Sequence, residues 1–408
     1  MNILHILPWT SFGGVPNYVK GLLKGLNILG HKNVCVGLDR CFEVYRHYCD
    51  VYVAIKDRLS KTHLANAILN TTKIHLYQIL KLDFSHVLSG ADVDSVIINN
   101  DPRVIRLNDV IKLGIPIIRV QHGTYMNYLY WYRYLPIPAI DRIKWLSHTL
   151  LYHYDILRYL RRESRLFPNF YIVAVSERTR KELIHYGIPP NKIYVVTGGV
   201  DKDVFKPLPK DKARNTLNNL LGTHLDENSE VVLHVGSSPR KGTHILLKAL
   251  KMLTSLRKVK TIIVGSLRGL YGRYLLGLMM ENNLHKNVLL LSRVPNNLMP
   301  LLYNVADIVV QPSYSEGCPL TLLESLACGI PIITTDVGCN EDYLKNIGLI
   351  DLLIRINKPD FSQELIDKII HALENKRHYR RRVFSHWDKI PSWIEIAKKY
   401  VSLVKNLE

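Results

Sequence analysis

Residues 307–334 contain two buried-strand patterns with a turn and a helix pattern between them. The apolar run at 307–311 is typical of a buried strand, and the run at 330–334 is typical of a second one. Between them, Pro319 begins a helix pattern and Gly329 ends it, which are the usual positions for these two residues. Parallel strands need a helical crossover of this kind. Because strand and helix patterns alternate along the whole chain, we expect an α/β fold with doubly wound parallel sheets.

Two glutamates occupy the turn and the helix of this unit. Glu316 lies in the turn and Glu324 lies in the helix, eight positions later. The turn follows the carboxyl end of a strand, where open α/β sheets bind ligands. The backbone N–H groups that begin the helix favour an anion such as a diphosphate, and Glu324 can accept hydrogen bonds from a ribose diol. The pattern predicts a nucleotide-sugar site with Gly317, Pro319 and Leu320 at the start of the helix.

Two further groups of candidate residues in the first half of the chain follow predicted strands. Gly13 and Gly14 lie between a strand at 3–7 and a helix at 17–29, and paired glycines let a ligand approach the backbone closely. A full G-x-G-x-x-G pattern is missing, so we expect no nicotinamide cofactor. His122 follows a strand at 117–120, where doubly wound folds perform chemistry. A buried histidine satisfied by the backbone is the alternative for His122.

A basic pair follows the first strand of the second half of the chain. The strand at 231–235 leads into a loop that contains Ser237, Arg240 and Lys241. Two cations on such a loop can neutralise the negative charge of a diphosphate leaving group. The alternative is a solvated basic turn.

The motif around Glu316 and Glu324, with Ala-Cys-Gly-Ile-Pro at 327–331, resembles the retaining family-4 glycosyltransferases, also called glycosyl transferases group 1. The resemblance implies the GT-B architecture, in which two Rossmann-like doubly wound domains face a central cleft. Residues 198–207 look like the hinge of that family, and a polar stretch follows them. We therefore expect an N-terminal acceptor-side domain at 1–205 and a nucleotide-sugar-binding domain at 206–385. A C-terminal helix at 386–408 should return to the first domain.

The same resemblance implies the reaction and the roles of the residues. A hexose would move from a nucleoside-diphosphate sugar to an acceptor hydroxyl of a lipid-linked or surface glycan, with retention at the anomeric carbon. His122 and Glu316 would be the catalytic residues and would hold the transferred sugar. The donor would be bound by Gly13, Gly14, Ser237, Arg240, Lys241, Gly317, Pro319, Leu320 and Glu324. The nucleotide-sugar would be a co-substrate, and neither a cofactor nor a metal ion is expected.

The chain departs from the family pattern at two positions. Ser237 stands where the family usually has arginine or asparagine, and Cys339 replaces a glycine in the turn at 336–341. These changes leave open a catalytically silent glycosyltransferase-like scaffold. The pair Asp92 and Asp94 precedes a strand at 95–98 rather than ending one, so we interpret it as a turn and not as a metal site.

The cysteines and the apolar runs indicate a cytoplasmic protein. The six cysteines contain no C-x-x-C pair and no zinc-like spacing, so we expect reduced thiols. The N-terminal segment lacks the basic region and the apolar length of a signal peptide. No stretch of about 18 uninterrupted apolar residues is present, so a spanning helix is not expected.

The formal net charge of +19 suggests an acidic partner. A basic nucleic-acid-binding protein is one alternative, but no zinc-finger spacing and no isolated helix-turn-helix supports it. The excess is concentrated at 119–167, where eight Arg or Lys occur with eight Tyr and two Trp. From 140 onward a helical face of Ile143, Leu146, Leu150, Tyr154, Leu157 and Leu160 precedes Arg158, Arg161, Arg162 and Arg165. Peripheral contact with an anionic membrane and packing of this helix into the first domain remain the two alternatives.

Overall fold

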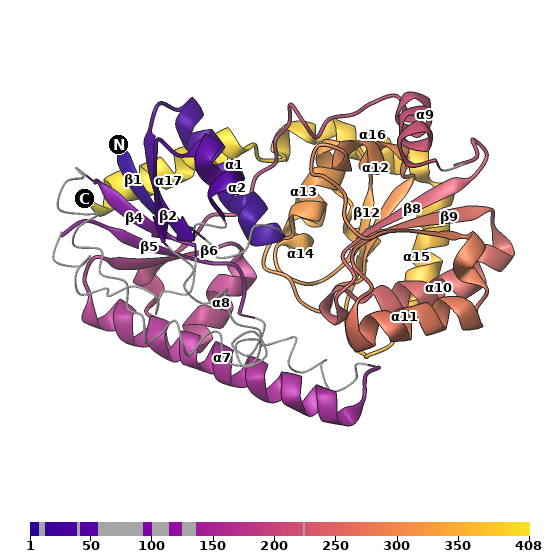
Figure 1. The fold of residues 1–408 in the computed structure, drawn as a ribbon, viewed down its shortest axis with the longest axis horizontal. Helices are drawn as coiled ribbons and strands as arrows, with labels where there is room; N and C mark the ends of the chain where they lie inside the picture. The colour runs from indigo at the N-terminus through magenta and orange to yellow at the C-terminus, as the bar shows by residue number, and fades with distance from the viewer. Residues whose placement is uncertain (8–12, 39–40, 56–92, 100–113, 125–135, 223–224) are drawn as a thin grey trace. The chain divides into compact units, whose positions relative to one another are not determined.

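The computed structural model describes the chain except for residues 8–12, 39–40, 56–92, 100–113, 125–135 and 223–224, and except for several side chains of helix α7 (Figure 1). The contacts group the chain into two compact units. Unit 1 contains residues 1–123, 154–199 and 392–408, and unit 2 contains residues 124–153 and 200–391. The domain boundaries expected from the sequence stay a prediction.

Unit 1 is built on a seven-stranded parallel sheet with the order β3-β2-β1-β4-β5-β6-β7. Its strands are β1 (Asn2–Ile6), β2 (Lys32–Leu38), β3 (Val51–Ile55), β4 (Ser95–Ile98), β5 (Ile117–Gln121), β6 (Phe170–Ala174) and β7 (Ile193–Val195). The order reverses between β1 and β4, since β2 and β3 lie on one side of β1 and β4 lies on the other. This is the topological switch point at which doubly wound sheets bind ligands.

The helices of unit 1 include one from each end of the chain. They are α1 (Gly14–Ile28), α2 (Phe42–Tyr45), α8 (Glu177–His185) and α17 (Trp393–Leu407), with 3-10 turns η2 (Arg46–Tyr48) and η4 (Pro190–Lys192). Gly21 and Gly25 of α1 lie against Trp393 of α17, and a Cβ at Gly21 would come within 2.0 Å of that indole. The Tyr18 and Tyr400 hydroxyls are 2.9 Å apart. These contacts fix the last helix against the first.

Unit 2 is built on a six-stranded parallel sheet with the order β10-β9-β8-β11-β12-β13. Its strands are β8 (Glu230–Val235), β9 (Val259–Val264), β10 (Val288–Leu291), β11 (Ile308–Gln311), β12 (Ile332–Thr335) and β13 (Leu353–Ile354). The order reverses between β8 and β11. Residues 231–233 and 308–310 are fully buried, as expected for parallel strands covered on both faces.

The helices of unit 2 alternate with its strands along the chain (Figure 1). They are α9 (Lys210–Leu221), α10 (Thr243–Leu256), α11 (Gly269–Glu281), α12 (Met299–Val305), α13 (Leu320–Ala327), α14 (Asn340–Asn346), α15 (Ser362–Glu374) and α16 (Lys376–Ser385). The described residues of this unit also contain the 3-10 turns η5 (Pro239–Lys241), η6 (Leu284–Lys286), η7 (Ile350–Leu352) and η8 (Trp387–Lys389). The two parallel sheets with interleaved helices confirm the predicted α/β class.

Helix α7 (Ala139–Leu166) contributes residues to both units. The single apolar face expected for it is only partly buried. Leu157 and Leu160 are buried, whereas 67% of Ile143 and 64% of Tyr154 is exposed. A regular apolar spacing defines a face of a helix, but the neighbours decide which part of that face is covered. The aromatic run at 125–134 lies outside the described residues. No helix in the described part of the chain combines the length and apolar character needed to cross a bilayer.

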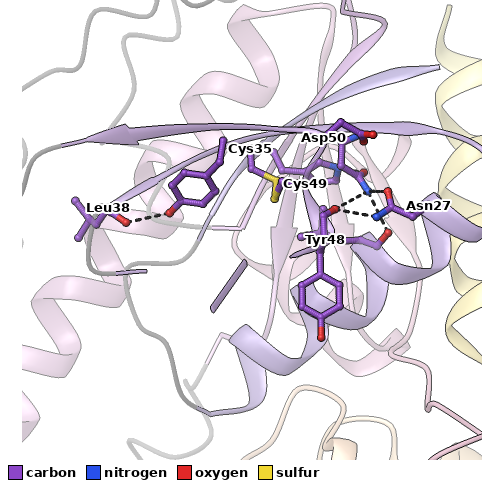
Figure 2. Close-up of a disulfide and its surroundings, with 10 residues drawn as sticks. Asn27, Cys35, Leu38, Tyr48, Cys49 and Asp50 are labelled. Atoms are coloured by element: carbon purple, nitrogen blue, oxygen red, sulfur yellow. Dashed lines mark hydrogen bonds between the residues drawn. A yellow bond between two sulfur atoms is a disulfide. The ribbon is translucent and has the colours of Figure 1, made fainter. Parts of the chain in front are cut away.

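The expectation of six reduced cysteines is wrong for four of them. Cys35 on β2 and Cys49 form a disulfide with a Cα–Cα distance of 5.9 Å (Figure 2). Cys318 and Cys339 form a second one with a Cα–Cα distance of 5.0 Å. The partners are 14 and 21 positions apart in the sequence and become neighbours only through the fold. Cys41 and Cys328 are free and buried.

Most expected elements are present, with ends that differ by at most three residues. A serine before a helix pattern, such as Ser176, is typical of an N-cap residue. In the structure its hydroxyl accepts a hydrogen bond of 3.1 Å from the N–H of Thr179 at the start of α8. Strand β3 was not predicted. The sequence also predicts a strand at 349–354, where the structure instead has the 3-10 turn η7 followed by the two-residue β13. A helix is predicted at 103–113 as well, and those residues lie outside the described part of the chain.

Candidate functional site

The predicted donor-binding loops of unit 2 meet at the switch point of its sheet. The loop after β8 carries Arg240 and Lys241 in η5, and the loop after β11 carries Glu316. Because β8 and β11 are adjacent parallel strands, their carboxyl ends lie at the same edge of the sheet. The sequence predicted these residues on separate loops, and the topology brings them together.

Glu316 is the centre of a buried charge cluster. Its Oε1 lies 2.7 Å from the Lys241 ammonium, and its Oε2 lies 2.7 Å from Nη1 of Arg240. The Ser313 hydroxyl donates to Oε1 at 2.9 Å, and the Gln311 amide donates to the same oxygen at 3.3 Å. The Glu316 side chain is only 7% exposed. Both carboxylate oxygens therefore already accept hydrogen bonds, and the carboxylate holds the two cations in place.

The pKa of Glu316 shows which of the opposing effects dominates. Burial alone would raise the pKa of this carboxyl, but the Arg240 and Lys241 cations together outweigh burial and lower it to about 2. Burial also lowers the pKa of the Lys241 ammonium, against the opposing attraction of Glu316. Glu316 is therefore anionic at any physiological pH, and it is a weak proton acceptor.

Glycines make room for the basic loop. Gly236 has a φ of 112°, and a Cβ there would come within 2.7 Å of the Lys241 side chain. Gly242 has a φ of 68°, and its Cβ would meet the Pro312 carbonyl oxygen at 1.9 Å. Because other residues strain at positive φ and a side chain would clash here, these positions favour glycine. The lysine can thus lie across the end of β8 and reach the loop after β11.

The start of α13 is held to a neighbouring turn. Pro319 is the N-cap residue and Leu320 is the first helical residue, so the helix begins one position later than the sequence predicted. Gly338, with a φ of 58°, lies so close to Gly317 that a Cβ would come within 2.1 Å of the Gly317 carbonyl oxygen. The Cys318–Cys339 disulfide joins the same two segments covalently. This bond fixes the loop that carries Glu316 beside the turn before α14.

Glu324 is held by a tyrosine that the sequence analysis missed. The hydroxyl of Tyr303, on α12, donates to Oε2 of Glu324 at 2.6 Å. Tyr303 is fully buried, whereas Glu324 keeps partial access to solvent. Burial raises the pKa of Glu324 to about 7, although the tyrosine hydrogen bond and Lys241 act to lower it. The two glutamates of the motif therefore have opposite electrostatic environments.

Ser237 lies apart from this cluster. Its hydroxyl donates to the Ser266 carbonyl at 2.7 Å, in the loop after β9.

The sequence analysis also missed Gln311 and Ser313, the two other donors to Glu316. Gln311 ends the buried strand β11, and Ser313 lies in the loop between that strand and Glu316. A polar residue in that position of a parallel strand is the signal that could have identified them.

The predicted residues of unit 1 follow strands β1 and β5 of the other sheet. Gly13, with a φ of 117°, is the N-cap residue of α1, and Gly14 begins that helix. His122 follows β5, and its ring lies edge-on to Tyr18 of α1 with the centroids 4.8 Å apart. Nε2 of His122 is buried without a hydrogen-bond partner. Burial and the nearby Arg119 lower the pKa of His122 to about 3, so the imidazole is neutral at physiological pH.

The described part of the chain contains no cluster of three His, Cys, Asp or Glu residues suited to a metal ion. Asp94 accepts a hydrogen bond of 2.6 Å from the N–H of Asn2, which fits the turn role assigned to it. Asp92 lies outside the described residues.

Sequence comparison identifies two family models and several relatives. Residues 12–204 match glycosyltransferase family 4, and residues 222–384 match glycosyl transferases group 1. A D-inositol 3-phosphate glycosyltransferase of Gordonia bronchialis is 33% identical over 177 residues, which are 41% of this chain and 37% of that protein. A protein of the same name from Streptosporangium roseum is 30% identical over 210 residues, which are 49% of this chain and 47% of that protein. The matches therefore span less than half the length of these relatives.

Solved structures share the fold over the whole chain. Anabaena Alr3699/HepE, in complex with UDP-glucose, has a TM-score of 0.73 at 17% identity, with all of both chains covered. A glycosyltransferase from Rickettsia africae has a TM-score of 0.70 at 18% identity, covering 100% of this chain and 98% of that one. The two family matches and the two-sheet fold together show that the chain belongs to the glycosyltransferases of the GT-B type.

Proposed function

We propose that this protein is a retaining hexosyltransferase that uses a nucleoside-diphosphate sugar. The observation that carries the proposal is the cluster of Arg240, Lys241 and Glu316 at the switch point of unit 2. Two cations held at fixed positions beside the start of a helix suit the charge of a diphosphate. Oε2 of Glu324 accepts a hydrogen bond from Tyr303, and its second carboxylate oxygen suits a hydrogen bond from a ribose diol.

In the proposed reaction, the bond between the anomeric carbon and the diphosphate oxygen breaks. A new bond forms between that carbon and the acceptor oxygen on the same face of the sugar. The acceptor proton passes to the departing diphosphate. Glu316 is a poor candidate for that proton, because its pKa is about 2 and donors occupy both of its oxygens. Arg240 and Lys241 stabilise the negative charge that develops on the leaving group.

Glu316 and His122 have separate roles in this proposal. Glu316 orients the two cations, and an exchange of one of its present donors for a sugar hydroxyl would let it hold the transferred hexose. His122 supplies a neutral ring nitrogen, Nε2, whose lack of a partner suits a hydrogen bond to a sugar hydroxyl. Neither role requires a metal ion, since the positive charge at the diphosphate comes from side chains.

The acceptor is proposed to be a hydroxyl on a polyol or glycan. The relatives from Gordonia and Streptosporangium are named for D-inositol 3-phosphate, a phosphorylated ring polyol. A membrane-associated acceptor is supported by α7, which exposes Ile140, Ile143, Leu151 and Tyr154 ahead of exposed Arg158, Arg161, Arg162 and Arg165. Apolar and basic side chains along one helix are typical of binding at an anionic membrane surface.

The test is the release of nucleoside diphosphate from UDP-glucose, GDP-mannose and ADP-glucose by wild type, Lys241→Ala and Lys248→Ala. Removing one charge that stabilises the transition state should lower turnover by about 100-fold to 1,000-fold. Lys248 pairs with Asp360 in the same unit and is 40% exposed, so its alanine variant is the matched control. Equal turnover in wild type and Lys241→Ala would refute the assignment. No turnover in wild type with any donor and any acceptor would favour a catalytically silent scaffold.

A further inference from the structure

Asn99, directly after β4, is buried without hydrogen bonds to its side chain. It is 3% exposed, and neither Oδ1 nor Nδ2 has a partner. Among the side-chain amides of the described residues, it is the only one for which both atoms are buried and unpaired. Its backbone is fixed, because the N–H of Asn99 donates to the Ile6 carbonyl at 3.0 Å. A fixed amide with no internal partner suggests a partner from outside the chain.

A second buried asparagine in the same sheet shows the usual arrangement. Asn33 on β2 is fully buried, and its Nδ2 donates to the Leu23 carbonyl at 3.0 Å. Its Oδ1 accepts a hydrogen bond of 2.9 Å from Nε2 of His5. The fold thus satisfies an asparagine that serves the structure of unit 1. Asn99 differs because it lies at the switch point between β1 and β4, where ligands bind.

Asn99 and His122 share one face of the sheet. Ile98 of β4 is in register with Arg119 of β5, and successive side chains of a strand alternate between faces. Asn99 and His122 therefore lie on the face opposite to Arg119 and Gln121. His122 contacts Tyr18 of α1, so this is the face that α1 covers. Helix α1 begins at Gly14 and is the first described helix after β1, which is one of the two strands at the switch point.

The chemistry of this pair is neutral. The amide of Asn99 offers one acceptor and two donor hydrogens, and the neutral imidazole of His122 offers Nε2. The hydroxyl of Tyr18 already contacts that of Tyr400, so it is engaged elsewhere. A sugar or cyclitol hydroxyl, which both donates and accepts, complements an amide and an imidazole. A phosphate would need donors with positive charge, and neither of these groups supplies one.

We propose that Asn99 is a ligand-binding residue which, together with His122, hydrogen-bonds the ring hydroxyls of an uncharged sugar or cyclitol at the switch point of unit 1. The inference rests on the proposed function, since the ring is either the transferred hexose or the acceptor. It adds to that function a residue in unit 1 that recognises hydroxyl groups rather than charge.

The experiment compares wild type, Asn99→Leu and the matched control Asn33→Leu. Without added ligand, Asn99→Leu should melt at or above the wild-type temperature, because leucine removes an unpaired buried amide. Asn33→Leu should melt several degrees lower, because it breaks a satisfied network. A fall in melting temperature for Asn99→Leu as large as that of the control would overturn the proposal.

Binding is then measured with UDP, UDP-glucose, D-glucose and myo-inositol. Asn99→Leu should bind UDP like wild type and should lose about tenfold in affinity for a ring ligand, as expected for two neutral hydrogen bonds. A loss for UDP-glucose assigns the ring to the transferred hexose, whereas a loss confined to myo-inositol assigns it to the acceptor. Unchanged affinity for every ring ligand would mean that Asn99 holds an ordered water only and would overturn the proposal. Failure of wild type to turn over any donor would instead count against the proposed function.

Discussion

Replacing each motif glutamate by glutamine should change the pH dependence of stability in opposite directions. The pKa of Glu324 is raised from 4.5 to about 7, so the folded chain keeps this proton after the unfolded chain has lost it. Stability therefore falls as pH rises from 4.5 to 7, and it stays reduced above pH 7. The difference between the two pKa values corresponds to about 3 kcal/mol of unfolding free energy.

Glu324→Gln removes this cost. At pH 8 the variant should be more stable than wild type by about 2 kcal/mol, after allowance of about 1 kcal/mol for a weakened hydrogen bond to Tyr303. At pH 4 the wild-type carboxyl is protonated in both states, so only the weakened hydrogen bond remains. The gain should therefore disappear at low pH.

Glu316→Gln should show the opposite sign. The pKa of Glu316 is lowered from 4.5 to about 2, so its contribution to stability is present above pH 4.5 and is lost as pH falls through 2. At pH 8 the variant should lose about 3 kcal/mol or more, because Arg240 and Lys241 remain partly buried without their counter-charge. The two variants thus serve as controls for each other.

Chemical denaturation at pH 4, 6 and 8, at constant salt and with the disulfides intact, measures these differences. Both glutamates lie in unit 2, so the same unfolding transition should be compared even if the two units unfold separately. Loss of stability at pH 8 in Glu324→Gln, or parallel pH curves for the two variants, would refute the electrostatic reasoning.

Three further predictions concern the disulfide, metal ions and the membrane. Cys318→Ser should lower the unfolding free energy by about 3 kcal/mol in non-reducing urea titrations and by nothing when dithiothreitol is present, since the closed loop spans 21 positions; equal curves without reductant would show that the bond does not form in solution. Sugar transfer should survive exhaustive chelation, because Arg240 and Lys241 carry the charge at the diphosphate; recovery only on addition of manganese or magnesium would contradict this. Co-sedimentation with anionic vesicles should exceed that with neutral vesicles and fall at high salt, by an amount consistent with about 1 kcal/mol for each of the four exposed arginines of α7; equal binding to both vesicle types would exclude the basic face.

Local signals predicted the elements of unit 2 well. The strand β11, the helix α13 and the strand β12 follow from two apolar runs, an initial proline and a terminal glycine. Those features act within a few residues, so they can be recognised in one sequence. The strand β3 was missed because its five residues lie among segments that give no clear pattern. The sequence left open whether α7 is exposed or packed, because periodicity identifies a face and not what covers it.

The contacts that define the candidate site depend on the order of the strands. Arg240 and Glu316 are separated by 76 positions, and they meet because β8 and β11 are adjacent in the sheet. Tyr303 belongs to the apolar pattern of α12, where nothing in the sequence marks its hydroxyl as the partner of Glu324. The disulfides were missed for the same reason. Sequence identified the residues on loops, and topology was needed to pair them.

The two switch points present different polar groups, and this difference bears on the kind of ligand group that each could recognise. In unit 2 the polar groups are charged, and Arg240 and Lys241 are paired with Glu316. A diphosphate bound there would take the place of Glu316 as a partner of these two cations. In unit 1 the groups are neutral, and Asn99 and His122 keep unpaired atoms. A diphosphate is bound best by positive charge, whereas the hydroxyls of a sugar or cyclitol ring need neutral donors and acceptors. Because hydroxyl recognition depends on unpaired neutral groups, changes at Asn99 should alter the binding of the ring and leave diphosphate binding in unit 2 unchanged. Variation of Asn99 and its neighbours would then alter which sugar or acceptor is used without changing the chemistry at the leaving group.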